Sequence, residues 1–376
     1  MSNKTPIQWT HSTCNPSMGC DGCELWPNPS KVRSELVTLA LSASGESKLR
    51  LTALIGLELH PYEYASQIFH DRIDLALKLE SLIPEVPSYL WLEKLEQIFK
   101  CYAGILHIYR GGKPADWSTP SVKGHAAIFE KPELFPGRVA KSANLPDLRG
   151  KKAKDSPWLD GLPRLIFLSD MGDALSRSIS FDYLKAEIID NVTSPQGQRH
   201  IWLWLTKRPK RMAEFARWLE SRDLTWPDNL VAMTTITNQK TSNRIANLRQ
   251  VPAKVRGLSI EPLWEDVALD LQGIDWAIVG GESGKSARPF DLSWARSLLT
   301  QCHQSETAFF MKQLGANIVD DGYPLTVRDR HGGNWEEWPC DLRVREFPQS
   351  FHDDSLIQSQ PEKSNPPETP TIVPSC

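Results

Sequence analysis

The chain has 376 residues, of which 40% are hydrophobic and 24% are charged, and its formal net charge is −3. This composition is typical of a folded protein with one large domain or two ordinary ones, and the charge excludes a global attraction to nucleic acid. A nucleic-acid partner would therefore need a local basic patch. No segment reaches the ~18 consecutive apolar residues of a membrane span, and residues 1–16 lack the apolar stretch of a signal peptide. We expect a cytoplasmic protein with no membrane partner.

Two cysteines near the N-terminus have the spacing of metal or cluster ligands. Cys20 and Cys23 are separated by two residues in the turn-rich opening, residues 1–23, so one tight turn can aim both thiolates at one centre. The pair alone is compatible with zinc, an iron–sulfur cluster or a redox dithiol. The third ligand is either Cys14, which the spacing favours, or Cys101. Three thiolates would leave one iron of a [4Fe–4S] cluster open to a small molecule.

The next segment, residues 24–100, has a different pattern. Apolar residues recur at helical spacing with charges between them, and prolines interrupt the run. We interpret this segment as a helical insertion that separates Cys23 from Cys101. Further along, residues 138–157 are basic and loop-like. They could contact a phosphate backbone, although a solvated loop is the preferred interpretation.

Six short apolar runs follow, and candidate helices lie between them. Each run has the length of a buried strand and is rich in branched or aromatic residues. The runs are 165–168, 201–205, 229–235, 257–260, 275–279 and 308–311. Alternation of strands and helices with short connections predicts a parallel sheet. Additional strands near residues 125–130 and near the N-terminus would bring the number to eight.

Polar residues follow each of these runs. In a TIM-like barrel the chemistry takes place at the C-terminal ends of the strands, so we expect an α/β fold with a partial or full TIM-like parallel β/α barrel. A doubly wound open sheet is the alternative. The barrel would comprise residues 1–23 and 101–347, with 24–100 as the insertion. Residues 348–376 are rich in Pro, Ser, Glu and Gln, and we expect them to form a disordered C-terminal tail.

Four charged residues at predicted strand ends are candidate catalytic or substrate contacts, and each has a structural alternative. Asp170 and Asp173 could bind a substrate, adenosine hydroxyls or a metal, or could cap a helix. Lys207 could hold a carboxylate or phosphate, or could belong to a solvated turn. Glu261 could contact substrate, or could form a buried ion pair with Lys312.

A glycine-rich segment at residues 280–284 is a candidate cofactor contact. Gly280 and Gly281 allow close approach of a backbone, and Glu282 can accept hydrogen bonds from an amine. The structural alternative is a tight turn from strand to helix. The segment is not a dinucleotide-binding fingerprint, because the third glycine at the required spacing is missing.

Several motifs occur together along the chain. They are Trp9-Thr10, Asn15-Pro16, Gly19-Cys20, Cys101-Tyr102-Ala103, FLSDMGD (167–173), LTKRPKRM (205–212), SIEPL (259–263), DWAIVGGESG (275–284), ARPFDLSWAR (287–296), FFMKQLG (309–315) and EWPCDLRVRE (337–346). In these motifs the chain resembles a phage-associated, radical-S-adenosylmethionine-like family of unknown function. Genes of that family neighbour the gene of a three-Cys-motif partner protein.

The resemblance implies a ligand set, a cosubstrate and partners. Cys20, Cys23 and Cys101 would be the three ligands of a [4Fe–4S] cluster that binds S-adenosyl-L-methionine. In radical S-adenosylmethionine enzymes a similar Gly-Gly-Glu element binds the methionine amine, which makes Gly280, Gly281, Glu282 and Ser283 the candidate cofactor contacts. The implied partners are an electron donor of the flavodoxin or ferredoxin type and the three-Cys-motif partner protein.

The expected function is therefore that of a radical S-adenosylmethionine enzyme. It would generate a 5'-deoxyadenosyl radical and abstract hydrogen from an unidentified substrate, with nucleic acid or a nucleotide as the candidate in a phage or phage-defence context. The alternative is a non-catalytic zinc-binding or cluster-binding protein that acts with a partner protein in nucleic-acid processing or defence.

Overall fold

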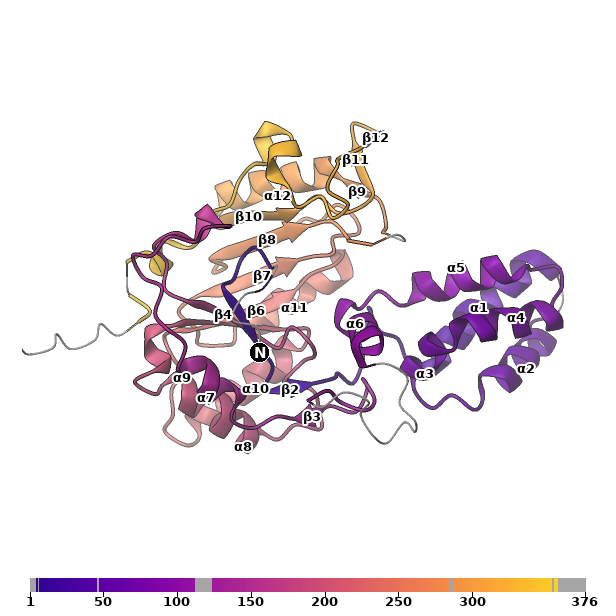
Figure 1. Cartoon of the computed structure of the whole chain (residues 1–376), viewed down its shortest axis with the longest axis horizontal. Helices are drawn as coiled ribbons and strands as arrows, with labels where there is room; N and C mark the ends of the chain where they lie inside the picture. The colour runs from indigo at the N-terminus through magenta and orange to yellow at the C-terminus, as the bar shows by residue number, and fades with distance from the viewer. Residues whose placement is uncertain are drawn as a thin grey trace, which may run out of the picture.

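The computed structural model describes residues 5, 7–45, 47–111, 124–284, 287–353 and 355–357. Its centre is a seven-stranded parallel sheet, curled as a half-barrel, in which the strand order follows the chain order (Figure 1). A doubly wound sheet would reverse its strand order at one point, and this sheet does not. Its strands are β1 (Ser12–Cys14), β4 (Leu165–Leu168), β5 (Ile201–Thr206), β6 (Leu230–Thr235), β7 (Arg256–Ile260), β8 (Trp276–Gly280) and β10 (Ala308–Gln313).

The six predicted apolar runs all form strands of this sheet, and the predicted N-terminal strand is β1. The strand predicted near residues 125–130 is wrong, because these residues form turns and bends. Their apolar side chains are buried elsewhere: Phe129 packs edge-on against Trp26 with ring centroids 5.3 Å apart. The segment that follows contributes β3 (Glu133–Leu134), which pairs with β2 (Ser17–Met18) outside the main sheet.

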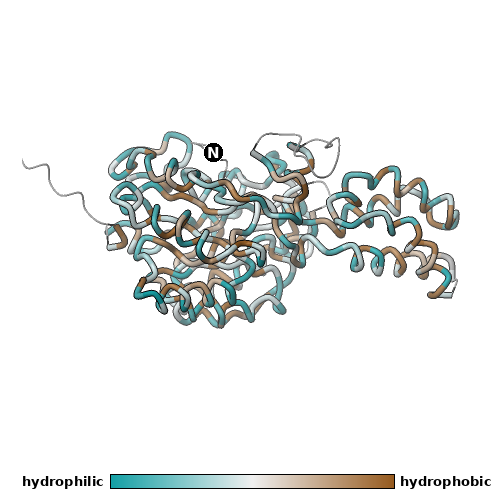
Figure 2. The backbone as a smooth tube through the Cα atoms, turned by 90° about the horizontal axis from the view of Figure 1, so that it is seen from below, coloured by the Kyte–Doolittle hydropathy of each residue, from teal (hydrophilic) through white to brown (hydrophobic). Residues whose placement is uncertain are grey.

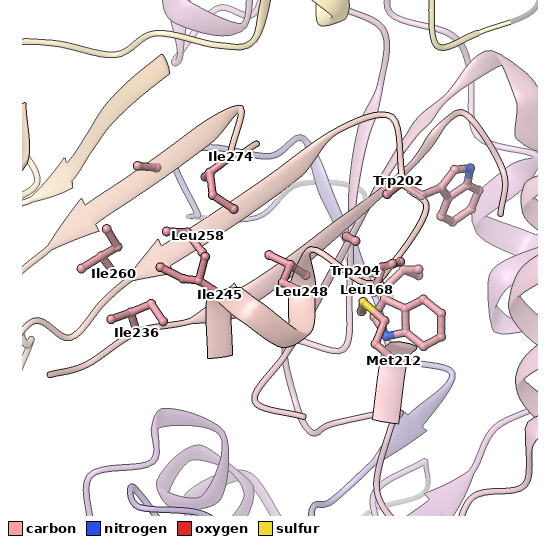
Figure 3. Packing of buried hydrophobic residues seen from close by; sticks show 14 of the residues in the cluster. Leu168, Trp202, Trp204, Met212, Ile236, Ile245, Leu248, Leu258, Ile260 and Ile274 are labelled. Atoms are coloured by element: carbon pink, nitrogen blue, oxygen red, sulfur yellow. The ribbon is translucent and has the colours of Figure 1, made fainter. Parts of the chain in front are cut away.

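Side chains of the main strands alternate between two faces, as the pleat of a strand requires. The outer face packs on helices and holds the largest core, in which Trp204 lies beside Met212 and Leu258 lies near Ile245 (Figure 3). Both faces are covered, which explains why the strands are almost continuously apolar. The covering helices are α7 (Arg138–Ala143), α8 (Phe181–Leu184), α9 (Asp190–Val192), α10 (Pro209–Glu220), α11 (Arg244–Leu248) and α12 (Leu292–Gln304).

The inner face of the half-barrel changes character along the strands. Near the strand starts it is apolar and includes Phe167, Met233 and Phe310, all buried in one core. Two residues beyond Met233, and therefore on the same face, lies Thr235, while Lys312 lies at an irregularity of β10 and pairs with Glu261 after β7. On the inner face, the C-terminal ends of the strands therefore carry polar side chains, whereas the N-terminal parts of the strands carry apolar core side chains.

The segment predicted as a helical insertion is helical in the structure. It has its own buried core, in which Leu36, Ile55, Leu79 and Trp91 are inaccessible to solvent. The helices extend away from the half-barrel, which gives the molecule its elongated shape (Figures 1 and 2). They are α1 (Pro29–Ser44), α2 (Lys48–Leu59), α3 (Ala65–His70), α4 (Arg72–Leu82) and α5 (Ser88–Ile98), and α6 (Tyr102–Gly111) begins directly after Cys101.

The first residues of the predicted C-terminal tail are packed on the half-barrel. A short 3-10 helix, Gln349–Phe351, buries Phe351 against Trp276 with ring centroids 5.6 Å apart, and Leu356 is also buried. These few apolar side chains cover the start of the strands despite the polar composition around them. Residues 358–376 lie outside the described residues.

A small second sheet lies beside α12, formed by β9 (Phe290–Asp291), β11 (Ile318–Asp320) and β12 (Tyr323–Leu325). Within the described parts of the chain, no helix has both the length and the apolar character needed to cross a membrane.

Candidate functional site

The loop that carries Cys20 is held at the C-terminal end of β4 by two glycines. Gly19 and Gly172 form a parallel bridge, in which the Gly19 amide donates to Met171 (3.2 Å) and the Gly19 carbonyl accepts from Asp173 (3.2 Å). A Cβ on Gly172 would lie 2.4 Å from the Gly19 oxygen, so only glycine permits this approach. The packing of two backbones therefore brings Cys20 to the strand ends.

The structure groups Cys101, and not Cys14, with Cys20 and Cys23. Burial raises the pKa of Cys20 to about 12, and the nearby thiols of Cys23 and Cys101 add to the effect. Burial likewise raises the pKa of Cys101 to about 11, and the nearby thiol of Cys23 also raises this pKa. Cys14 faces the opposite way, into the outer core between the sheet and α7, where Ser142 is its neighbour. Sequence spacing favoured Cys14 because it could not show the face on which β1 presents this side chain.

Each of the three grouped sulfurs accepts an N–H donor. Arg208 donates to Cys20 Sγ from both terminal nitrogens (3.5 Å each), the Leu25 amide donates to Cys23 Sγ (3.4 Å), and the Gly104 amide donates to Cys101 Sγ (3.4 Å). Such donors stabilise the thiolate form that metal and cluster ligands require.

Two cations accompany the three sulfurs. Burial lowers the pKa of Lys207, but the neighbouring Cys23 and Cys101 together with two carboxylates outweigh it, so the net pKa is raised. Burial also lowers the pKa of Arg208, but the neighbouring Asp173 and Cys20 outweigh burial, so the net pKa is raised. The guanidinium and the ammonium therefore place fixed positive charge beside the cysteines, which lowers the cost of holding thiolates in a buried site.

Asp173 is a positioning residue for this loop. Its buried carboxylate accepts hydrogen bonds from the hydroxyl of Thr206 (2.9 Å), the amide of Lys207 (3.1 Å) and the guanidinium of Arg208 (2.8 Å). Arg208 in turn donates to the Gly22 carbonyl (2.9 Å) and pairs with Asp21. Both carboxylate oxygens of Asp173 are used in these contacts, which give it a structural role, and its role as a substrate contact stays a prediction.

Two further predicted residues also have protein partners. Asp170 accepts a hydrogen bond from the Asn15 side chain (2.5 Å), and burial raises its pKa. Glu261 forms an ion pair with Lys312, so the structural alternative considered for this pair is the one observed. Both residues still lie at strand ends, Asp170 after β4 and Glu261 after β7.

Within residues 280–284, Gly280 and Gly281 pack against β10 and the chain after it, and Glu282 links the segment to the insertion. A Cβ on Gly281 would lie 2.3 Å from the Leu314 oxygen, so close approach to the chain after β10 accounts for this glycine, whereas a Cβ on Gly280 would lie 3.2 Å from the Gln313 oxygen. Glu282 is paired with Lys100 at 3.8 Å, with only 10% and 6% of the two side chains exposed.

Glu282 also accepts a hydrogen bond from the Arg288 amide (3.0 Å). Its ion pair with Lys100 ties Glu282 to the residue that directly precedes Cys101. The glycine-rich segment therefore lies where the chain leaves the insertion. Ser283 is exposed.

Sequence reasoning missed the polar contacts that fasten the cysteine loop to the half-barrel. Glu24, the residue after Cys23, forms a two-pronged ion pair with Arg244 of α11 (3.0 and 2.8 Å). Arg244 also donates to the Thr235 carbonyl at the end of β6 (2.8 Å). The sequence carries no signal for a pair separated by 220 positions.

Unused polar groups lie at the same strand ends. The buried side-chain oxygens of Ser169, Thr235 and Thr237 and the indole nitrogen of Trp264 have no hydrogen-bond partner among the described residues. Buried polar groups without a partner are rare in folded proteins, so these groups are candidate contacts for a ligand with polar atoms.

The cysteine site fits a cluster in its donor set. In the part of the chain that the structure describes, no three His, Cys, Asp or Glu side chains come close enough together to hold a single metal ion. The thiolates of a [4Fe–4S] cluster bind different irons, so they are spaced more widely than the ligands of one ion. Three converging sulfurs with N–H donors and two flanking cations are suited to such a cluster.

A family model described as Protein of unknown function (DUF5131) matches residues 114–344, which is more than half of the chain. Comparison with curated proteins found no match, and neither did comparison with solved structures. The matched region contains strands β4 to β10 and their polar ends, whereas Cys20, Cys23 and Cys101 precede it. By this match the chain belongs to the DUF5131 family.

Proposed function

We propose that this protein is a radical S-adenosylmethionine enzyme whose Cys20, Cys23 and Cys101 hold a [4Fe–4S] cluster at the mouth of an open TIM-like barrel. The observation that carries the proposal is the convergence of three sulfurs from two distant segments, each with an N–H donor. Such a cluster would leave one iron free for S-adenosylmethionine and would supply one electron, received from a flavodoxin-like or ferredoxin-like donor, for cleavage of its C5'–S bond into methionine and a 5'-deoxyadenosyl radical.

The chain's own residues divide the work around this site. Asp173 fixes the guanidinium of Arg208, which orients the loop of Cys20 through its contacts with the sulfur and with Gly22. Lys207 adds positive charge next to the other two sulfurs. Arg208 and Lys207 are thus positioning and electrostatic residues.

Ligand contacts would come from a second group of residues. The unpartnered hydroxyls of Ser169 and Thr235 at the strand ends are available to hydrogen-bond a bound cosubstrate or substrate. Glu282, held between Lys100 and the Arg288 amide, is the candidate acceptor for the methionine amine. The buried position of these groups would exclude water from a reactive intermediate.

The first test is the metal content of protein purified without oxygen. We expect about four iron and four sulfide per chain and a broad absorption band near ~400 nm, as cysteine-ligated clusters give. Cys101→Ala should lose the band and most of the iron. The matched control is Cys14→Ala, a buried cysteine on the other face of the sheet, which should retain both. Zinc without iron, no metal at all, or loss of the cluster in Cys14→Ala but not in Cys101→Ala would overturn the assignment.

The second test separates an enzyme from a protein with a structural cluster. Reduced, reconstituted protein is incubated with S-adenosylmethionine, and 5'-deoxyadenosine is measured by liquid chromatography. We expect its formation in the wild type and in Cys14→Ala, and its absence in Cys101→Ala. A full cluster that yields no 5'-deoxyadenosine would favour the non-catalytic alternative.

A further inference from the structure

A cleft of about 680 Å³ separates the helical insertion from the half-barrel. Its volume is in the range of ~300–1,000 Å³ in which proteins bind small ligands. One wall is formed by α1, α5 and the chain after Cys23. The other wall is formed by the loops that follow β6, β7 and β8, and it includes Lys240, Trp264 and Arg288.

The cleft has an excess of positive charge although the whole chain has a net charge of −3. Its two acidic residues are already paired, Glu35 with Lys94 (3.0 Å) and Glu24 with Arg244 (2.8 Å). The remaining lining cations are Lys31, Lys100, Lys240 and Arg288. Lys100 is paired with Glu282, whereas Lys31 and Lys240 have no ion-pair partner within the described ranges. This is the local basic patch that an anionic ligand requires.

An aromatic and guanidinium pair lies in the same cleft. The guanidinium of Arg288 stands 3.9 Å from the ring centroid of Trp264. The buried indole N–H of Trp264 has no hydrogen-bond acceptor among the described residues, so a ligand oxygen could supply one. A flat guanidinium beside an aromatic ring suits a nucleobase, and lysines suit a phosphate.

The cleft also adjoins the cysteine site. Glu24 and Lys100 both line it, and they are the direct sequence neighbours of Cys23 and Cys101. We propose that the cleft binds a nucleotide unit, free or within a single strand, with its phosphate on Lys31 and Lys240 and its base near Arg288. The role of the cleft as the enzyme's substrate site rests on the proposed function, whereas nucleotide binding by the cleft is measured independently of that function.

The test is fluorescence anisotropy with labelled single-stranded DNA and RNA oligonucleotides of twelve nucleotides, in a series of salt concentrations. We expect salt-sensitive binding that weakens about tenfold or more in the double variant Lys31→Glu/Lys240→Glu, because two phosphate contacts become repulsions. The negative slope of log affinity against log salt should become shallower by about 1.4, since each contact to a single strand contributes about 0.7. Competition with unlabelled ATP separates the two sources: displacement indicates a free nucleotide, and no displacement indicates a strand.

The matched control is Lys151→Glu/Lys152→Glu, which reverses two exposed lysines in the basic loop that the sequence offered as a rival contact. This variant should bind as the wild type does. The cleft assignment fails if no probe binds, if the cleft variant binds normally, or if the loop variant loses binding equally. Arg288→Ala provides a second cleft variant, expected to weaken binding without charge reversal. Iron and sulfide in the same preparations report on the enzyme proposal separately, so a cluster-free protein that binds through the cleft would overturn that proposal alone.

Discussion

The half-barrel and the helical insertion are stabilised in different ways. The strands of the half-barrel are buried on both faces, and large side chains such as Trp202 and Trp204 are inaccessible to solvent. The insertion has a smaller core, which continues through Trp26 to Phe129 outside it, and polar contacts also fasten it to the rest of the chain. These are Trp26 and Ser66 to Glu130, Lys100 to Glu282, and Arg244 to Glu24.

This difference has a consequence for the candidate site. The region that matches the DUF5131 family supplies a scaffold with polar strand ends. The insertion delivers Cys101 and one wall of the cleft, and its position depends on these polar contacts and on the packing of Trp26 against Phe129. Substitutions in the half-barrel should therefore change global stability, whereas substitutions at the junction should change the placement of the third cysteine first.

The largest effect of a single substitution is expected for Asp173→Ala in the half-barrel. The substitution removes one of the two carboxylates that pair with Arg208, together with the acceptor for Thr206 and for the Lys207 amide, which should lower the free energy of unfolding by about 3–5 kcal/mol. Urea unfolding followed by circular dichroism measures it. The control is Asp266→Ala at an exposed position, which should leave the unfolding midpoint unchanged. Equal effects of the two substitutions would contradict the positioning role of Asp173.

The next effect is a loss of half-barrel stability in acid. Burial lowers the pKa of His200, and that of His11, from 6.5 to about 4. Neutral His11 accepts a hydrogen bond from the Leu165 amide (2.9 Å), which a protonated ring nitrogen could not do. Between pH 6.5 and pH 4 the unfolded chain binds more protons than the folded chain, so stability is complete above pH 6.5 and falls as the pH drops to 4.

Each of these histidines should contribute about 3 kcal/mol to this loss, following 1.36 kcal/mol for each pKa unit. Unfolding in urea at several pH values checks it, and His200→Gln should flatten the profile by about half. A profile that His200→Gln leaves unchanged would show that His200 is not buried in its neutral form.

A smaller and more local effect is expected for Glu130→Ala at the junction. The change removes the acceptor of the Trp26 indole (2.7 Å) and of the Ser66 hydroxyl (2.7 Å), at a cost of about 1–3 kcal/mol for the unpartnered buried donor. Hydrogen exchange should accelerate in α3 and around Cys101 while β4 to β8 stay protected. Uniform acceleration across the sheet would mean that the insertion and the half-barrel unfold as one unit.

The smallest effect is expected for Lys94→Ala inside the insertion. Its ion pair with Glu35 (3.0 Å) is partly exposed, so its loss should cost about 0.2–1 kcal/mol and less at high salt. Thermal unfolding at low and high salt measures the difference. A loss that is large and insensitive to salt would indicate that α1 and α5 are held together mainly by this contact.

The sequence alone determined the elements and the alternation of the half-barrel. Runs such as 201–205 and 275–279 were recognisable as strands, because a strand buried on both faces is almost continuously apolar. The helical insertion was equally readable from its periodicity. The run at 125–130 was misread because short apolar runs do not show which surface they will cover, and Phe129 covers Trp26.

Only the tertiary structure decided which cysteines lie together and which charges are already paired. Cys14 is closer than Cys101 to the Cys20 pair in sequence, yet the pleat of β1 turns it into the outer core. Asp173 and Glu261 have the chemistry of site residues, but Arg208 and Lys312 occupy them across large sequence distances. The physical reason is the same in each case: local patterns record burial and backbone periodicity, whereas contacts between distant segments follow from how the layers pack.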